Sequence, residues 1–342
     1  MAPERNDGTR PTDGRGLEPS SPLSVSAQGT LRATAEYHRQ SMLFGDRGQE
    51  ALSNATVGII GLGGVGSLVN EWVARLGVGR IIAVDFDRLE TSNLPRVVGA
   101  TRFDAGEPFV SSSIGFVRSI GRRLAKHKVV IAARVARQAN PHVVFQPIIG
   151  DIMDSTVAQQ LRNVDYLFLC ADGMPPRLVF NALVHQYLIP GVQIGSKVPV
   201  HKQTGAVGDV FAVARRVLPF FGGGCLSCNK MIPADKLHDE SLHPDERRRQ
   251  QYVAEELIAA PSVITLNAVA ASLAVNEFLF GFQGLLHESV TAGYGMHYLR
   301  ERRYEAIDVS AEKDCLHCSG TSRSAFARGD RWTLPCRVSN RG

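Results

Sequence analysis

The sequence predicts an α/β fold whose sheet is doubly wound and mostly parallel. Three observations lead to this prediction. Short apolar runs alternate along the chain with segments of helical spacing, which is the pattern of strands joined by crossover helices. The first apolar run, residues 57–60, is bounded by glycines and is typical of a strand buried on both faces. A glycine-rich turn then leads directly into a helical segment.

The opening unit is a strand, a turn, a helix and a second strand. Residues 67–76 repeat apolar side chains at helical spacing, and residues 80–84 form a second apolar run that ends at Asp85. Together with the first strand they make one βαβ unit of about 30 residues. This unit predicts a Rossmann-like, dinucleotide-type sheet.

The later core elements continue the alternation. We expect a helix at 128–139, a strand at 143–149, a helix at 155–162, a strand at 166–169, a helix at 177–188, strands at 191–200 and 208–214, and a long apolar helix at 263–282. Asn140-Pro141 closes the first of these helices. The last helix is expected in the core or at a dimer interface.

Several segments are expected outside this core. Residues 1–35 are rich in Pro, Gly, Ser, Asp and Arg without apolar periodicity, which predicts a disordered leader. Residues 36–320 form one ordered domain, with an insertion or flap at 99–127 and a charged crossover region at 225–262. Residues 321–342 form a basic tail.

Composition argues against nucleic-acid and membrane partners. The chain has 342 residues, and 44% of them are hydrophobic, which is ample for a large buried core. The net charge of +5 is modest and partly sits at the two ends, so nucleic-acid binding is not expected. There is no secretion signal and no run of about 18 apolar residues, which predicts a cytoplasmic protein without a membrane span.

Four of the six cysteines form two close pairs with CxxC spacing. The pairs are Cys225 with Cys228, and Cys315 with Cys318. Two such pairs can close one tetrahedral Cys₄ site, so we expect a structural Zn²⁺ without an open position for catalysis. The alternative is four ordinary reduced thiols.

The glycine turn is the first candidate for ligand binding. Gly61, Gly63, Gly64 and Gly66 allow backbone amides to approach phosphate oxygens at the start of a helix. Asp85 ends the neighbouring strand, where an acidic side chain normally takes ribose hydroxyls. Any nucleotide, NAD and FAD included, would satisfy this pattern, and the glycines also suit close helix packing.

The segment after Asp85 discriminates between nucleotides. From Asp87 through Asn93 to Arg96, it resembles the ThiF/MoeB/HesA family, relatives of the ubiquitin-activating enzymes. The resemblance covers residues 37–318. Its motifs are Tyr37-His38-Arg39-Gln40, the glycine turn, Ser92-Asn93-Leu94-Pro95-Arg96, Lys128 ahead of Asn140-Pro141, Ala171-Asp172 followed by Arg177 and Asn181, and the two cysteine pairs.

The resemblance implies an adenylyltransferase that uses ATP and Mg²⁺. Its substrate would be the C-terminal glycine carboxylate of a small ubiquitin-like or sulfur-carrier protein ending in Gly-Gly, with release of pyrophosphate. Arg39 would reach the nucleotide of the second subunit in a homodimer. By the same resemblance, the catalytic residues are Arg39, Arg96, Lys128 and Asp172, and the other nucleotide contacts are Gly61, Gly63, Gly64, Gly66, Asp85, Asp87 and Asn93.

Electrostatics gives these residues a physical role. A carboxylate nucleophile repels the phosphates of ATP, so Arg39, Arg96 and Lys128 must neutralise both anions as the α-phosphorus is attacked. Asn93 can donate hydrogen bonds without adding charge. Asp172 supplies a hard oxygen for Mg²⁺, which screens the leaving pyrophosphate.

The chain departs from the family pattern in two places. Residues 229–282 contain no cysteine for a thioester, so the reaction is expected to stop at the acyl-adenylate, with Cys170 and Cys336 as weaker candidates. Gly173 stands where the family usually has Asn. Three alternatives stay open: activation of a tRNA-bound or peptide carboxylate, a non-catalytic binding scaffold, and an NAD-dependent dehydrogenase.

Overall fold

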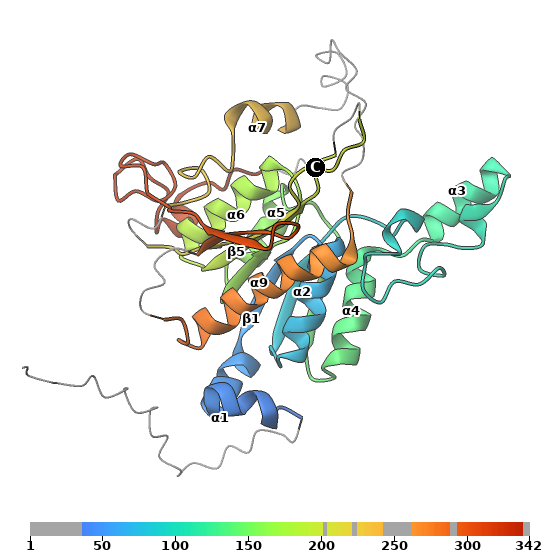
Figure 1. Cartoon of the computed structure of the whole chain (residues 1–342), viewed down its shortest axis with the longest axis horizontal. Helices are drawn as coiled ribbons and strands as arrows, with labels where there is room; N and C mark the ends of the chain where they lie inside the picture. The colour runs from blue at the N-terminus through green and yellow to red at the C-terminus, as the bar shows by residue number, and fades with distance from the viewer. Residues whose placement is uncertain (1–35, 201–203, 221–223, 242–260, 288–292, 338–342) are drawn as a thin grey trace, which may run out of the picture. The chain divides into compact units, whose positions relative to one another are not determined.

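A single eight-stranded sheet organises the described part of the chain (Figure 1). The computed structural model describes residues 36–200, 204–220, 224–241, 261–287 and 293–337, so the predicted leader lies outside the described residues. The strand order is β3-β2-β1-β4-β5-β6-β7-β8. The strands are β1 (Thr56–Ile60), β2 (Arg80–Val84), β3 (Val144–Ile148), β4 (Tyr166–Leu169), β5 (Gly191–Lys197), β6 (Phe211–Val217), β7 (Tyr294–Tyr298) and β8 (Arg303–Ala306).

The strand pairing confirms the predicted α/β fold with a doubly wound, mostly parallel sheet. The strands from β3 to β5 pair in parallel, whereas those from β5 to β8 pair antiparallel. The chain winds outward from β1 through β2 to β3, then returns to the other side of β1 for β4 and β5. The carboxyl ends of β1 and β4 therefore form a topological switch point, where open α/β sheets bind their ligands.

Helices cover the sheet on both faces (Figure 1). Alternating residues of one strand enter two different cores: Ile59 packs with α2, α4 and α9, while Ile60 packs with α5 and α6. The helices are α1 (His38–Asn54), α2 (Gly64–Arg75), α3 (Gly115–Leu124), α4 (Lys128–Ala139), α5 (Ser155–Ala158), α6 (Met174–Tyr187), α7 (Ala234–Ser241) and α9 (Ile264–Phe282), with 3₁₀ turns η1 (Thr91–Asn93), η2 (Phe109–Ser111), η3 (Gln159–Leu161) and η4 (Gly329–Arg331).

The observed elements differ from the predicted ones mainly at their ends. α6 begins at Met174, three residues before the predicted start at 177, because Pro175 and Pro176 lie in the first turn, where their missing amides cost nothing. The strands β7 and β8 have no counterpart in the prediction. All the residues of β8 are exposed, so this edge strand lacks the apolar run by which buried strands are recognised.

The helix α9 corrects one expectation about the membrane. Its mean hydropathy reaches 1.4, and by length and composition it is long and apolar enough to cross a bilayer, so the expected absence of such a run is wrong. In the described residues α9 packs along α2, β5 and β6, and it buries Ala270, Ala274 and Phe278. This packing is that of a core helix, as expected for residues 263–282.

The segment that follows residue 320 packs against the second core. Leu334 is buried there, and the backbone amide of Arg337 donates a 2.7 Å hydrogen bond to the carbonyl of Met153. Gln186 of α6 donates its side-chain amide to the carbonyls of Gly329 and Trp332. The predicted basic tail therefore contributes to the fold as far as Arg337.

Candidate nucleotide site and cysteine cluster

The glycine turn lies at the carboxyl end of β1, at the switch point of the sheet. Gly61 has a φ of +90°, and a Cβ placed on it would lie 2.8 Å from the backbone nitrogen of Ala171. A Cβ on Gly66 would lie 1.9 Å from the carbonyl oxygen of Gly61. Gly63 precedes α2 without any side-chain cap, so the first amides of this helix keep donors for an anion.

Asp85, at the end of β2, holds the glycine turn in place. Its carboxylate accepts hydrogen bonds from the backbone amide of Leu62 at 2.7 Å and from that of Asp87 at 2.8 Å. Burial raises the pKa of Asp85, while the nearby Lys128 ammonium and these two amides oppose that shift. The side chain thus holds the conformation of the turn at the position where a ribose would bind.

Lys128 and Asp87 form an ion pair beside this carboxylate. The Nζ of Lys128 lies 2.6 Å from Oδ2 of Asp87, and the backbone amide of Lys128 donates to the carbonyl of Asp87 at 3.0 Å. Only 11% of the Lys128 side chain is exposed. This double link joins the end of β2 to the start of α4, and it brings a cation to the carboxyl edge of the sheet.

Asn93 and Arg96 lie on the segment that follows Asp87 in the chain, and this segment packs next to α2. Asn93 is buried, and its Oδ1 accepts a hydrogen bond from the backbone amide of Glu90 at 3.4 Å. The hydroxyl of Ser67 accepts the amide of Val98 at 3.1 Å, which ties the segment to α2. The guanidinium of Arg96 has no hydrogen-bond or ion-pair partner among the described residues, and Arg96 is partly buried beside Gly64.

Asp172 extends the site from β4. Its neighbour Ala171 packs against Gly61, and the Cβ of Cys170 packs against Gly66, so this loop lies beside the glycine turn. Asp172 itself is exposed. The structure therefore brings Gly61, Gly63, Gly64, Gly66, Asp85, Asp87, Asn93, Arg96, Lys128 and Asp172 to one end of the sheet.

Arg39 does not lie with these residues. It is exposed near the start of α1, whose Gln40 donates a hydrogen bond to the carbonyl of Leu76, just beyond the last turn of α2. The glycine turn is at the opposite end of α2, and a helix of 12 residues is about 18 Å long. Within one chain, Arg39 is separated from the nucleotide end of the sheet.

Asn267 is a polar residue of this site that the sequence did not assign. It is buried in α9, where its amide accepts from the hydroxyl of Ser196 at 2.8 Å and donates to that of Ser262 at 3.0 Å. A Cβ on Gly64 would lie 2.3 Å from its Nδ2. An Asn within an apolar helix was the available signal, because a buried amide needs partners that the helix itself does not provide; Asn276 in the same helix carries the same signal, so the sequence does not single out Asn267.

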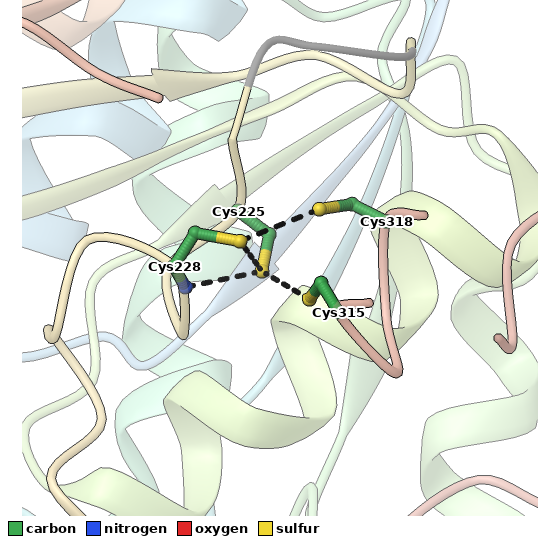
Figure 2. A group of neighbouring side chains, drawn as sticks. All are labelled: Cys225, Cys228, Cys315 and Cys318. Atoms are coloured by element: carbon green, nitrogen blue, oxygen red, sulfur yellow. Dashed lines mark hydrogen bonds between the residues drawn. The ribbon is translucent and has the colours of Figure 1, made fainter. Parts of the chain in front are cut away.

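The two cysteine pairs converge into one cluster (Figure 2). The Sγ atoms of Cys225, Cys228, Cys315 and Cys318 point toward one another and all lie within 4.8 Å. Three of the Sγ–Sγ distances are 3.6 Å. A tetrahedron with Zn–S bonds of about 2.3 Å has edges of about 3.8 Å, so the geometry fits a Cys₄ zinc site.

Packing around the cluster holds both pairs in place. Asn181 of α6 accepts the backbone amide of Leu226 at 3.0 Å, and Leu226 is fully buried in the second core. The backbone amides of Glu312 and His317 point at the sulfurs of Cys228 and Cys315. These N–H groups favour thiolates, which are the form that binds a metal.

The cysteine cluster also faces buried basic side chains. Arg215 on β6 is buried, and its guanidinium donates to Asn229 at 2.9 Å and to the carbonyl of Gly224 at 3.1 Å. Burial lowers the pKa of Arg215 to about 10. The hydrogen bond with Cys315, together with burial, raises the pKa of the Cys225 thiol. A bound cation would offset this cost and replace the thiol protons.

A glycine turn before a helix, an acidic residue on the next strand and a switch point together define a Rossmann-like nucleotide-binding fold. The ThiF family profile matches residues 37–318, and the chain belongs to the ThiF family. This confirms the resemblance inferred from the spaced motifs.

Among curated proteins, the chain is 32% identical over 147 residues to the sulfur carrier protein adenylyltransferase of Thermus thermophilus, covering 42% of this chain and 47% of that protein. It is 31% identical over 160 residues to the molybdopterin-synthase adenylyltransferase of Escherichia coli, covering 46% of this chain and 55% of that protein. The chain thus spans about half the length of the curated relatives it matches.

Among solved structures, the chain is similar to E. coli MccB in its crystal structure with ATP. The TM-score is 0.59 at 21% sequence identity, over 84% of this chain and 74% of that chain. At this identity the likeness is one of fold. It extends beyond the opening βαβ unit to most of the chain.

Proposed function

We propose that this protein uses MgATP to adenylate the C-terminal glycine carboxylate of a small sulfur-carrier or ubiquitin-like protein that ends in Gly-Gly. The observation that most strongly supports this is the grouping of the Lys128–Asp87 pair, Arg96 and Asp172 around the glycine turn. The names of the curated relatives support the same class of reaction and substrate. The proposed setting is the cytoplasm, where the four thiols would remain reduced and available to Zn²⁺.

In the proposed reaction, a carboxylate oxygen attacks the α-phosphorus of ATP, and the bond between the α-phosphorus and the bridging oxygen breaks. The products are the acyl-adenylate and pyrophosphate. Lys128 and Arg96 hold the phosphates and neutralise the charge that builds up on them. Asp172 would be the protein ligand of Mg²⁺, which supplies charge screening on the leaving group. Asp85 would hold the ribose.

The separation of Arg39 from its own nucleotide end supports a homodimer as part of this proposal. An exposed cation about one helix length from the glycine turn cannot act there without a second chain. In a two-fold dimer each α1 would extend to the other subunit, so each site would receive its third cation in trans. The two sites would then depend on one another for charge neutralisation.

The product would leave as an acyl-adenylate for an external nucleophile. Burial raises the pKa of Cys170, and the nearby Asp172 raises it further. Burial raises the pKa of Cys336 to about 11. Neither thiol supplies a thiolate near neutral pH, and the other four cysteines belong to the cluster. A thioester on this chain is therefore not part of the proposal.

The test is exchange of labelled pyrophosphate into ATP, with purified small proteins that end in Gly-Gly as substrates. We expect exchange that requires MgATP and a substrate with its last glycine, together with a carrier–AMP adduct in intact mass spectrometry. Exchange driven by tRNA or by a short peptide instead would assign another carboxylate. Tight binding of NADH in place of ATP would contradict the proposal altogether.

A further inference from the structure

The arm, defined here as residues 106–126, is a described segment that contributes no residue to the nucleotide site. It consists of η2, α3 and the turns around them, and it covers most of the predicted flap at 99–127. α3 packs on η2 through Gly121, where a Cβ would lie 2.6 Å from the backbone nitrogen of Val110. Figure 1 shows α3 beyond α4, away from the sheet.

The arm exposes apolar side chains in an ordered pattern. Phe116, Ile120 and Leu124 recur every four residues on α3 and are 76%, 37% and 57% exposed. This spacing places the three on one stripe along the helix. Phe109 and Ile114 are exposed as well. Single exposed apolar residues are normal on a protein surface, but a stripe of this kind marks an interaction site.

The same segment is cationic, and Glu107 at its start is its single acidic residue. Between Pro108 and His127 the charged residues are Arg118, Arg122, Arg123 and Lys126. Neither Arg122 nor Arg123 has a hydrogen-bond or ion-pair partner among the described residues. Arg123 lies seven residues, or about two helical turns, after Phe116, so it borders the apolar stripe. The arm is therefore complementary to an apolar patch with an acidic rim.

The root of the arm is rigidly joined to the nucleotide site. Asp104 is only 1% exposed, and it binds the guanidinium of Arg134 at 2.7 Å and the ammonium of Lys126 at 2.9 Å. The carbonyl of Lys126 accepts the amide of Leu89 at 2.8 Å. Lys128 follows two residues later. These contacts hold the base of the arm next to Lys128, at the rim of the nucleotide site.

We propose that the arm is the docking surface for the protein whose carboxylate is activated, and that this partner has an apolar patch surrounded by acidic side chains. The inference rests on the proposed function. α3 is about 15 Å long, and a C-terminal tail of six extended residues spans about 20 Å. A folded partner seated on α3 can therefore deliver its tail to the carboxyl edge of β1 while its globular part stays on the arm.

A folded protein fits the arm better than the other occupants of a basic surface. A nucleic acid needs phosphate contacts and does not require three aliphatic and aromatic groups in a row. α3 has only 10 residues, so it buries little in a bilayer. Self-association would not require the arm to lie directly before Lys128 in the chain. The carboxylate donor must arrive at that rim in every cycle.

The experiment compares the whole carrier with a synthetic hexapeptide of its C-terminal sequence in pyrophosphate exchange. Two variants remove the surface, Phe116→Ser with Leu124→Ser, and Arg122→Glu with Arg123→Glu. Matched controls are Val144→Ser and Arg137→Glu, which change an exposed apolar and an exposed basic residue away from the arm. We expect each arm variant to raise KM for the carrier about tenfold, with kcat and the KM for the hexapeptide unchanged.

The outcomes separate the docking surface from the reaction itself. An inactive wild-type protein would contradict the proposed function, whereas an active wild type with unaltered arm variants would contradict the docking surface alone. Loss of self-association in light scattering, of binding to phosphatidylserine vesicles or of binding to a single-stranded RNA, with KM for the carrier unchanged, would assign the arm to another occupant. An equal rise in KM for carrier and hexapeptide would show only a distorted site.

Discussion

The cysteine cluster and the nucleotide end of the sheet are assembled in opposite ways. All four cysteines are buried, come from one chain and already lie at distances suited to a tetrahedral metal. At the nucleotide end, Asp172 is exposed, Arg96 has no partner among the described residues, and Arg39 lies at the far end of α2. The cysteine site is complete before its ligand binds, whereas at the nucleotide end Lys128 is held by Asp87 and the other charged groups are dispersed until the substrates arrive.

We expect the largest loss of stability from a substitution in the cysteine cluster, where all four proposed metal ligands are already in place. Cys225→Ser removes one of four ligands and leaves three thiols in a dry cluster, so we expect loss of bound zinc and a fall of more than about 4 kcal/mol in the free energy of unfolding. Elemental analysis and guanidinium denaturation measure both. Cys336→Ser is the control, since this cysteine lies outside the cluster, is partly buried against the second core and donates to the carbonyl of Ile152 at 3.8 Å; it should change stability by about 1 kcal/mol. A stable, zinc-loaded Cys225→Ser protein would contradict the Cys₄ site.

The next effect concerns the nucleotide site, which we propose is shared between two subunits. Lys128→Ala and Arg39→Ala each remove a cation from the reacting phosphates, and each is expected to slow exchange about 10²–10³-fold, or roughly 3–4 kcal/mol, without loss of fold. Arg137→Ala on the exposed side of α4 is the control. In the proposed homodimer, mixing the two variants after dissociation is expected to give hybrid dimers with one intact site, which would restore about a quarter of the wild-type rate for random assortment. No recovery on mixing would show that Arg39 does not act in trans.

The smallest effect tests the link between the arm and the body. Burial by itself raises the pKa of Asp104, but hydrogen bonds from Arg134, Lys126 and Thr101 outweigh it and hold the pKa well below its usual value. The stabilisation is therefore complete above the unfolded pKa of about 4 and is lost as the pH falls below it.

We expect Asp104→Asn to lower the free energy of unfolding by about 2 kcal/mol at pH 7, because it leaves the half-exposed Arg134 and Lys126 without the buried carboxylate that binds them. The difference from the wild type should shrink as the pH falls from about 4. Urea denaturation across that range measures it. A difference that is constant with pH would mean that the carboxylate acts by packing and not by charge.

The sequence located most of the nucleotide end because the glycine turn, Asp85 and Asp172 each follow a recognisable strand. Lys128 and Asp172 were assigned from a motif spacing, and the structure brings both to the turn of Gly61 and Gly66. What the sequence did not supply was Asn267, which comes from a helix about 200 residues later. Its role depends on Ser196 and Ser262 in three dimensions, and no local pattern records such a contact. The exposed strand β8 was missed for a related reason, since it lacks a buried face.

The sequence by itself determined the alternation of strands and helices, the glycine turn and the two cysteine pairs, because apolar periodicity, φ > 0 and metal spacing are local requirements on neighbouring residues. Only the tertiary structure decided that Arg39 lies apart from its own site, that the segment to Arg337 enters a core, and that the arm stands on Asp104 at the rim of the nucleotide end. These facts depend on which distant segments pack together. That packing is decided by how much surface the whole fold buries, which no local stretch of sequence determines.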